Sequence, residues 1–211
     1  MRLPGAASFG LSVAIVLWAA IVAAGFAYVL EYETTPGDSD VPPTHWPAGS
    51  SLVPRPNRVN LVLAAHPRCP CTRATIDELA ELMAQERQVI VAHVLVFKPG
   101  KSESGWERTD LWRRVAVIRG TEIWSDDDGT QAKRFGLRCS GHALLYDKNG
   151  RLLFSGGLTN ARGHSGDSVG RNAIVAILNG TVPPTNTTPV YGCSLFGMLA
   201  PSIERCSQCR E

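Results

Sequence analysis

The sequence predicts an α/β fold in which helices pack on a mixed central β-sheet, preceded by one N-terminal transmembrane helix. Three observations predict it. A long apolar run lies within the first 30 residues, strand and helix signals alternate after it, and a hairpin signal followed by a last helical stretch comes later. Two parallel crossovers followed by an antiparallel hairpin form an α/β sandwich whose sheet has strands in both directions.

The apolar run predicts a membrane anchor over residues 1–30. The stretch LSVAIVLWAAIVAAGFAYVL (11–30) contains no charged residue, and about 20 apolar residues cross a bilayer. Arg2 precedes the run, whereas Glu31 and Glu33 follow it. The positive-inside rule then places the rest of the chain outside the cytoplasm. We therefore expect a single-pass protein of the cell inner membrane with a periplasmic domain, although cleavage of the run as a signal peptide stays open.

Composition divides the rest of the chain into three parts. Residues 31–56 are rich in Pro, Gly, Ser, Asp and Thr, which predicts an irregular linker. Residues 57–180 carry the strand and helix signals and form the expected folded domain. Residues 181–211 begin with a Pro/Thr-rich stretch, contain cysteines later, and form a C-terminal extension.

The first half of the expected domain alternates strands and helices. RVNLVLAA (58–65) and QVIVAHVLVF (88–97) are short apolar runs, which are typical of buried strands. Apolar residues recur at helical spacing over residues 72–87 between these runs, and Thr75 with Glu78 makes a candidate capping box. This order predicts a βαβ unit with parallel strands.

The second half continues the alternation and then changes to a hairpin. We expect a helix within residues 108–120, a strand over 121–125 and a short helix within 126–137. The motif KNG (148–150) between two apolar runs predicts an antiparallel hairpin. An apolar stripe at helical spacing then predicts a last helix that ends at Gly180.

The charge pattern argues against nucleic acid as a partner. The formal net charge is +2 in 211 residues, and no stripe of Lys and Arg interleaved with aromatic residues occurs. Proteins that bind nucleic acids usually concentrate positive charge on one face. We therefore expect no nucleic-acid binding.

The stretch HPRCPCTRA (66–74) carries the chemistry. Cys69 and Cys71 lie between the first strand and the first helix, with one proline between them. The N-terminus of a helix has partial positive charge and free N–H groups, and both stabilise a thiolate. Arg73 and a protonated His66 would act in the same direction. The sequence therefore predicts a lowered thiol pKa and a reactive cysteine.

Four further cysteines leave several pairings open. Cys139 and Cys193 form either a structural disulfide, which an oxidising compartment favours, or one of them resolves the CPC pair. Cys206 and Cys209, near the C-terminus, predict a terminal disulfide or a free tail. Six cysteines allow 15 full pairings, so the sequence does not select the connectivity.

Together, the strand, CPC, helix and hairpin resemble the thioredoxin-like superfamily. The closest resemblance within it is to membrane-tethered, extracytoplasmic thiol–disulfide proteins related to peroxiredoxins and cytochrome-c maturation. DDDGTQAKRFGLRCSGHALLYDKNGRLLFSGG (126–157) strengthens this resemblance. HPRCPCTRA (66–74), FSGGLTNARGHSGD (154–167) and PVYGC (189–193) resemble a group of RedB-type proteins. The resemblance implies a thioredoxin-like sandwich with a mixed central sheet.

Two positions depart from the superfamily pattern. One residue separates the cysteines instead of two, and Gly141 holds the position of the usual cis-proline before the hairpin strand. The resemblance implies that the loop with Cys139 and His142 faces the CPC loop. Cys69, Cys71, Cys139 and His142 would then form an alternative site for copper or zinc, since thiolates and imidazole suit both metals.

The leading hypothesis is thiol–disulfide exchange by a membrane-tethered thioredoxin-like protein without a cofactor. Cys69 is expected to be the nucleophile and Cys71 its partner, with Arg73 and His66 stabilising the thiolate. The expected partners are protein or small thiol and disulfide substrates. Two alternatives stay open. One is a copper or zinc chaperone or assembly factor that uses the same cluster, and the other is a non-catalytic subunit of a larger membrane complex.

Overall fold

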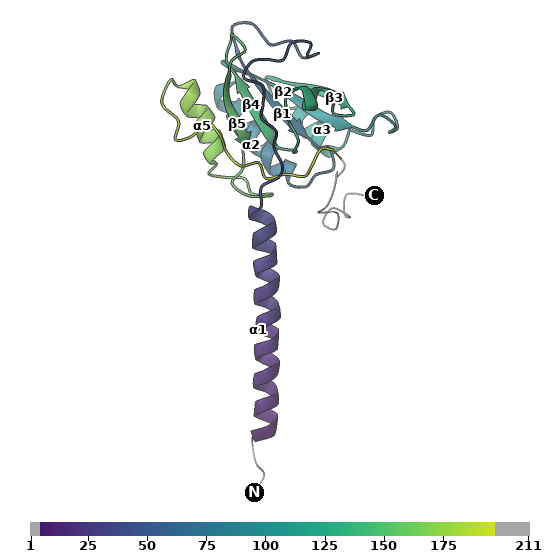
Figure 1. The fold of residues 1–211 in the computed structure, drawn as a ribbon, viewed down its shortest axis with the longest axis vertical. Helices are drawn as coiled ribbons and strands as arrows, with labels where there is room; N and C mark the ends of the chain where they lie inside the picture. The colour runs from purple at the N-terminus through teal and green to yellow at the C-terminus, as the bar shows by residue number, and fades with distance from the viewer. Residues whose placement is uncertain (1–4, 197–211) are drawn as a thin grey trace. The chain divides into compact units, whose positions relative to one another are not determined.

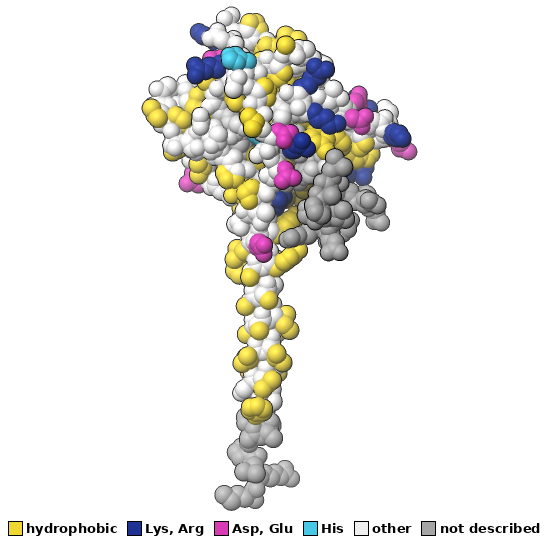
Figure 2. Space-filling view, in the orientation of Figure 1, with side chains coloured by type: hydrophobic (Ala, Val, Ile, Leu, Met, Phe, Trp, Pro, Cys, Tyr) yellow, Lys and Arg dark blue, Asp and Glu magenta, His cyan; other side chains and the backbone are white. Residues whose placement is uncertain are grey.

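The structure is a computed structural model that describes residues 5–196, and the chain divides after Thr35 into two compact units. The first unit contains one helix, α1 (Gly5–Thr34). Within it, Phe9–Thr34 is long and apolar enough to cross a membrane, by length and composition. Figure 2 shows hydrophobic side chains along the visible side of this helix. The predicted N-terminal helix is therefore confirmed as a helix that meets the requirements of a membrane span.

Helix α1 continues four residues beyond the predicted end of the anchor. The hydroxyls of Thr34 and Thr35 donate hydrogen bonds to the backbone carbonyls of Leu30 and Glu31, which extends the helical pattern. Pro36 ends the helix, because proline has no N–H and disfavours helical backbone at the residue before it.

The second unit is a mixed α/β sandwich, and the predicted fold class is confirmed. Its elements follow in chain order: β1 (Val59–Ala65), α2 (Thr72–Glu86), β2 (Ile90–Lys98), α3 (Asp110–Ala116), β3 (Thr121–Asp127), α4 (Thr130–Arg134), β4 (His142–Tyr146), β5 (Leu152–Gly157) and α5 (Val169–Leu178). The strands lie in the order β3-β2-β1-β4-β5 (Figure 1). β1, β2 and β3 are parallel, whereas β4 is antiparallel to both β1 and β5.

Strand β1 lies at the centre of the sheet and contributes to both cores. Leu61 and Leu63 face the larger core, which α2, α3 and α5 cover. Val62 and Ala64 face the opposite core, which contains α4 and the residues that follow it. Successive side chains of a strand point to opposite faces, so a continuous apolar run is what a strand buried on both faces requires.

One local expectation, the capping box at the start of α2, differs from the structure. Helix α2 begins at Thr72, with Cys71 as its N-cap residue, so Thr75 lies inside the helix and the predicted capping box is wrong. Glu78 instead accepts a hydrogen bond from the N–H of Gly166 and forms an ion pair with Arg171. The Thr75–Glu78 pattern was misleading because the same three-residue spacing also occurs between two residues inside a helix.

The predicted linker is irregular, but from Pro36 onward it belongs to the folded domain rather than acting as a free spacer. The carbonyl of Thr44 accepts from the N–H of Leu152, and the N–H of Trp46 donates to the carbonyl of Gly150. The Trp46 ring contacts the rings of His93, Phe135 and Tyr146 edge-on. Leu52 is also buried. The sequence did not indicate that Trp46 and Leu52 are packed, because the stretch around them has the overall composition of a linker.

The C-terminal extension is also part of the domain as far as the structure describes it. Thr187 pairs with Ser155 of β5, and Ser194 pairs with Cys139. Val190 and Leu195 are buried. Cys206 and Cys209 lie outside the described residues.

Trp46→Ala is expected to destabilise the domain by about 2–4 kcal/mol, because a large, partly buried aromatic side chain is removed from the second core. Denaturant unfolding of the full chain in detergent, monitored by far-ultraviolet circular dichroism of the backbone, measures this change in the free energy of unfolding. His45→Ala, next in the chain but with an exposed side chain, should change stability by no more than about 0.5 kcal/mol. Equal effects of the two variants would contradict the packing role of Trp46.

A candidate thiol site at the start of α2

The CPC motif forms the turn between β1 and α2. The N–H of Cys69 donates to the carbonyl of His66 (3.1 Å), and the N–H of Thr72 donates to the carbonyl of Cys69 (3.3 Å). Cys71 already has helical backbone angles, φ −65° and ψ −28°. Pro70 fits here because the first N–H groups of a helix have no partner within the helix. Both cysteines therefore lie at the N-terminus of α2, as predicted.

Ser140 joins this turn to the loop that precedes β4. Its hydroxyl accepts from the N–H of His66 (2.7 Å) and shares a hydrogen bond with the Thr72 hydroxyl (2.5 Å). The next residue, Gly141, has φ +91°, and its N–H donates to the carbonyl of Ala64 (2.7 Å). A Cβ at Gly141 would lie 3.0 Å from Thr75 Oγ1, so glycine suits both the backbone angle and the close approach.

A third segment brings another thiol to the turn. The carbonyl of Cys193 accepts from the N–H of Ser140 (2.9 Å), and the N–H of Leu195 donates to the carbonyl of Arg138 (2.8 Å). This pairing places Cys193 Sγ 2.8 Å from Cys69 Sγ. Cys69 is 2% exposed and Cys71 8% exposed, and Cys193 is the most exposed of the three. Three thiols therefore meet at the start of α2.

Hydrogen bonds hold the pKa of Cys69 far below the ordinary value of a thiol. The thiol of Cys193 has the largest effect, followed by the thiol of Cys71. Burial acts in the opposite direction and raises the pKa, but the hydroxyl of Thr72 and the N–H of Cys193 lower it further. Hydrogen bonds to a charged form favour that form. The surroundings therefore favour ionisation of Cys69 over that of the other two thiols.

The other two thiols keep their protons. The pKa of Cys193 is raised, first because its thiol hydrogen-bonds to Cys69, then because it hydrogen-bonds to Cys71 and is buried. The hydrogen bond from Cys71 to Cys193 lowers the pKa of Cys71. The hydrogen bond from Cys71 to Cys69 and the burial of Cys71 have a larger combined effect, so the pKa of Cys71 is raised. The cluster thus has one thiolate and two thiol donors.

The arginine beside the thiols is Arg162 rather than Arg73. The side chain of Arg73 is exposed and forms an ion pair with Asp110 of α3 (2.7 Å), so the expected contribution of Arg73 to the thiolate has no support in the geometry. Arg162 donates to the carbonyl of Gly192 (2.6 Å), next to Cys193. The pKa values of Cys71 and Cys139 are both raised overall, and the charge of Arg162 opposes that rise as one of the smaller effects. An arginine in the first turn of a helix points outward when an acidic neighbour attracts it.

His66 lies in the site, but not as the expected cation. Burial lowers its pKa, and this effect outweighs the nearby Cys69, which raises it. The ring stacks on Phe97 and contacts Trp106 edge-on, and its Nδ1 accepts from the N–H of Arg68 (3.3 Å). An aromatic, partly buried setting favours the neutral ring, so His66 closes the turn as a neutral group.

Cys139 and His142 point away from the CPC turn, so the expected metal-ligand set does not converge. The thiol of Cys139 donates to the carbonyl of Asp38 (3.0 Å), and burial raises its pKa to about 11. Cys139 pairs with Ser194 in an isolated bridge, and Ser140 lies in the turn that follows it. Among residues 5–196, no group of three or more His, Cys, Asp or Glu side chains has an arrangement that could hold a metal ion.

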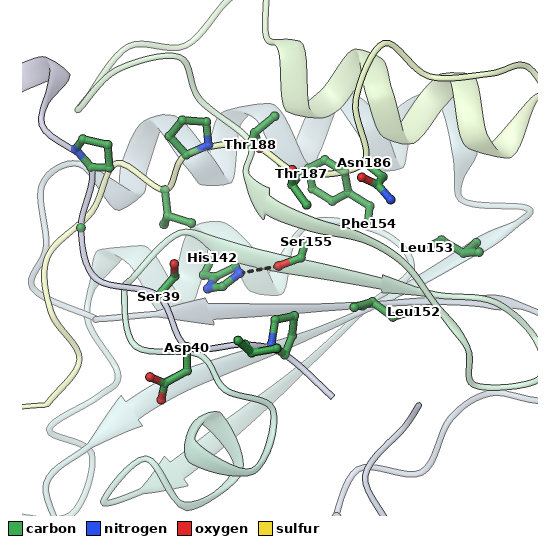
Figure 3. A pocket seen from close by; sticks show the side chains of 16 residues that line it. Ser39, Asp40, His142, Leu152, Leu153, Phe154, Ser155, Asn186, Thr187 and Thr188 are labelled. Atoms are coloured by element: carbon green, nitrogen blue, oxygen red, sulfur yellow. Dashed lines mark hydrogen bonds between the residues drawn. The ribbon is translucent and has the colours of Figure 1, made fainter. Parts of the chain in front are cut away.

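His142 lines a pocket of about 390 Å³ between residues 36–42 and 186–190. Figure 3 shows its ring directed toward Ser155, with Nε2 2.9 Å from the Ser155 hydroxyl. Nδ1 is buried and has no hydrogen-bond partner among the described residues. Burial lowers the pKa of His142 to about 4. No cysteine lines this pocket, so it is separate from the thiol site.

Sequence reasoning found Cys69 and Cys71 but missed the residues that surround them. Ser140 and Arg162 lie within the stretches 126–157 and 154–167 that carry the resemblance, but neither was expected at the thiol site, and Cys193 was only one of several candidate partners. The dipeptide Gly192-Cys193 was the one sequence feature that could have indicated that Cys193 lies close to another segment. A glycine beside a cysteine permits close backbone approach, and a Cβ at Gly192 would lie 1.7 Å from the carbonyl oxygen of Ser140.

Comparison with known proteins supports the fold. No family model and no curated protein sequence matches the chain. A hypothetical protein from Sinorhizobium meliloti is 21% identical with a TM-score of 0.55, over 79% of this chain and 96% of that one. An uncharacterized conserved protein from Geobacillus kaustophilus is 15% identical with a TM-score of 0.55, over 80% and 95%.

An exposed lipoprotein thioredoxin from Streptococcus pneumoniae is 17% identical with a TM-score of 0.43, over 59% of this chain and 85% of that one. The expected sandwich is observed: a mixed five-stranded sheet with helices on both faces. The RedB-type resemblance stays a prediction.

Removing the Cys193 thiol is expected to raise the pKa of Cys69 more than removing the Cys71 thiol, because Cys193 is the stronger donor. In the wild type, the thiolate absorbance of Cys69 should persist well below the ordinary thiol pKa of about 8.5. In Cys193→Ala the absorbance should be lost at a higher pH than in Cys71→Ala. Ultraviolet titration against a Cys69→Ala blank measures this order, and identical titrations of the two variants would contradict it.

Proposed function

We propose that this protein carries out thiol–disulfide exchange, with Cys69 as the reactive sulfur. The observation that carries the proposal is the environment of Cys69. Its sulfur lies 2.8 Å from Cys193 Sγ, the neighbouring Cys193, Cys71 and Thr72 side chains lower its pKa, and it lies at the N-terminus of a 15-residue helix. A thiolate is the form that attacks disulfides and leaves readily from them.

The arrangement contains the other groups that exchange requires. Exchange in a dithiol protein needs a second thiol within reach of the first, so that the mixed disulfide with a substrate is released. Cys71 and Cys193 both contact Cys69. The two protonated thiols would stabilise the thiolate at rest, and each is a candidate covalent partner of Cys69 on oxidation.

The proposed setting follows from α1. With this helix in the bacterial inner membrane and the domain in the periplasm, the protein would act where disulfides form and persist. Its partners would be proteins or small molecules with thiols or disulfides. No cofactor is required for this chemistry, since both electrons move through sulfur.

The metal hypothesis receives less support from the geometry. The expected ligands Cys139 and His142 each have other partners, Asp38 and Ser155. Copper or zinc binding therefore stays a prediction, as does a non-catalytic role in a larger membrane complex. Both predictions are tested on the same purified protein as the exchange activity.

Cys69→Ser is expected to abolish disulfide exchange, with a loss of at least about a hundredfold in rate, because the only low-pKa thiol of the cluster is removed. The assay is dithiothreitol-driven reduction of insulin by the full chain in detergent. Ser194→Ala, an exposed change close to the same cluster, should keep the wild-type rate.

Metal analysis of the wild-type sample separates the alternatives. Wild-type activity in Cys69→Ser would refute the proposed function. Near-stoichiometric copper or zinc, lost in Cys69→Ser, together with an inactive wild type would favour the metal carrier. An inactive, metal-free wild type that co-purifies with other membrane proteins would favour the non-catalytic subunit.

A further inference from the structure

The segment from Pro189 to Leu195 is irregular and passes beside the CPC turn, where backbone hydrogen bonds hold it at several positions. The carbonyl of Pro189 accepts from Gly157 of β5, and the carbonyl of Val190 accepts from Gly37. Further along, Cys193 and Leu195 pair with the loop before β4. We call residues 189–195 the Cys193 segment. Backbone pairing on both sides of Cys193 fixes where its side chain points.

The fit between the Cys193 segment and the CPC region leaves no room at one position. A Cβ at Gly192 would lie 1.7 Å from the carbonyl oxygen of Ser140, which no side chain tolerates without movement of the backbone. Arg162 adds a charged donor to the carbonyl of Gly192. Glycine and arginine thus bring the segment close enough for Cys193 Sγ to lie 2.8 Å from Cys69 Sγ.

The other candidate partners of Cys69 are placed less well. Cys139 is buried and bonds to the carbonyl of Asp38. Cys71 contacts Cys69, but it follows Pro70 and is already in helical conformation. A disulfide needs Cα atoms about 4.4–6.8 Å apart with suitably directed Cβ atoms. Cys71 would have to meet this requirement within the three residues 69–71, where the backbone constrains the directions of both Cβ atoms. Cys193 belongs to a different segment, so this constraint does not apply to it.

We propose that Cys69 and Cys193 form the redox pair of this protein, with Cys193 as the point of entry for external thiols and disulfides and Cys69 as the sulfur that resolves the mixed disulfide when an external disulfide is reduced. The inference rests on the proposed exchange function and identifies its second cysteine. Cys71 is then a hydrogen-bond donor that stabilises the Cys69 thiolate.

The exchange step follows from the exposure of the three sulfurs. In the oxidised pair, the thiolate of an external dithiol attacks Cys193 Sγ, the more exposed sulfur. The Cys69–Cys193 bond breaks and its electron pair stays on Cys69, which is the better leaving group because its thiolate is stabilised. The product is a mixed disulfide between Cys193 and the external molecule.

The second step completes a two-electron transfer. The other sulfur of the external dithiol attacks the external sulfur of the mixed disulfide, and Cys193 leaves and takes a proton from solvent. The external dithiol becomes a disulfide and releases its two thiol protons, while the protein pair becomes one thiolate and one thiol. The same steps in reverse reduce an external disulfide.

Disulfide mapping of the full chain in detergent tests the pairing directly. After equilibration in glutathione redox buffers, free thiols are alkylated and the protein is digested with trypsin. Cleavage after Arg68 and Arg73 leaves Cys69 and Cys71 together in peptide 69–73, while Cys193 lies in peptide 172–205. Cys206 and Cys209 fall in a separate peptide, 206–210. The expected oxidised species joins peptides 69–73 and 172–205, and reduced glutathione reverses it in the native protein.

Single variants identify the two sulfurs. Cys71→Ala should keep the link between the two peptides and its reversible titration, whereas Cys193→Ala should lose both and lose insulin reduction. An internal disulfide within peptide 69–73, with peptide 172–205 unlinked, would overturn the proposal. So would a link that reduced glutathione does not break in the native protein, since the disulfide would then be structural.

Gly192→Ala tests the same pairing with all thiols present. The added Cβ should push Cys193 away from Cys69 and lower the equilibrium constant for the disulfide by about tenfold or more, with Ser194→Ala as the matched control at wild-type value. An unchanged constant in a folded Gly192→Ala protein would count against the proposal. If Cys193→Ala stays fully active while Cys69→Ser is inactive, exchange by Cys69 stands and the assignment of Cys193 fails.

Discussion

The site depends on a buried, negatively charged sulfur that must receive hydrogen bonds from its surroundings. Cys69 is nearly inaccessible to water, and burial alone would keep its thiol protonated. Donors from two separate parts of the chain reverse this: Cys71 and Thr72 at the start of α2, and Cys193 from the C-terminal segment. The hydroxyl of Ser140, in the loop before β4, bonds to Thr72 and orients it. If these segments were separated, the Cys69 thiolate would lose its hydrogen-bond donors.

The sheet order brings these segments together. β1 is the central strand, with parallel β2 on one side and antiparallel β4 on the other. The end of β1 and the beginning of β4 therefore lie at the same edge of the sheet, which places the CPC turn beside Ser140. The Cys193 segment reaches the same edge because residues 186–190 run alongside β5, parallel to it, and pair with its backbone. Close approach at Gly141 and Gly192 then allows backbone contacts that larger residues would prevent.

Hydrogen-bond donors, rather than formal cations, stabilise the thiolate. Arg73 pairs with Asp110, and His66 is neutral in its aromatic surroundings. Arg162 is the nearby cation, and it acts on Cys71 and on the carbonyl of Gly192. A charge held by short-range donors responds to the position of those donors. Displacement of the Cys193 segment would change the protonation of Cys69, and this links the conformation of the C-terminal segment to the reactivity of the thiol.

The sequence by itself determined the features that depend on neighbouring residues. Apolar periodicity located the strands and helices, the length of the N-terminal run indicated the possible membrane span, and the position of CPC between a strand and a helix marked the reactive turn. Tertiary structure decided which groups meet there. Cys69 and Cys193 are 124 positions apart, and His66 and Ser140 are 74 positions apart. Contacts at such separations depend on the register of the sheet and on backbone approach at single glycines, which local propensity does not encode. The same reason explains why residues 36–56 have the composition of a linker: Trp46 and Leu52 gain their packing only when the sheet has formed.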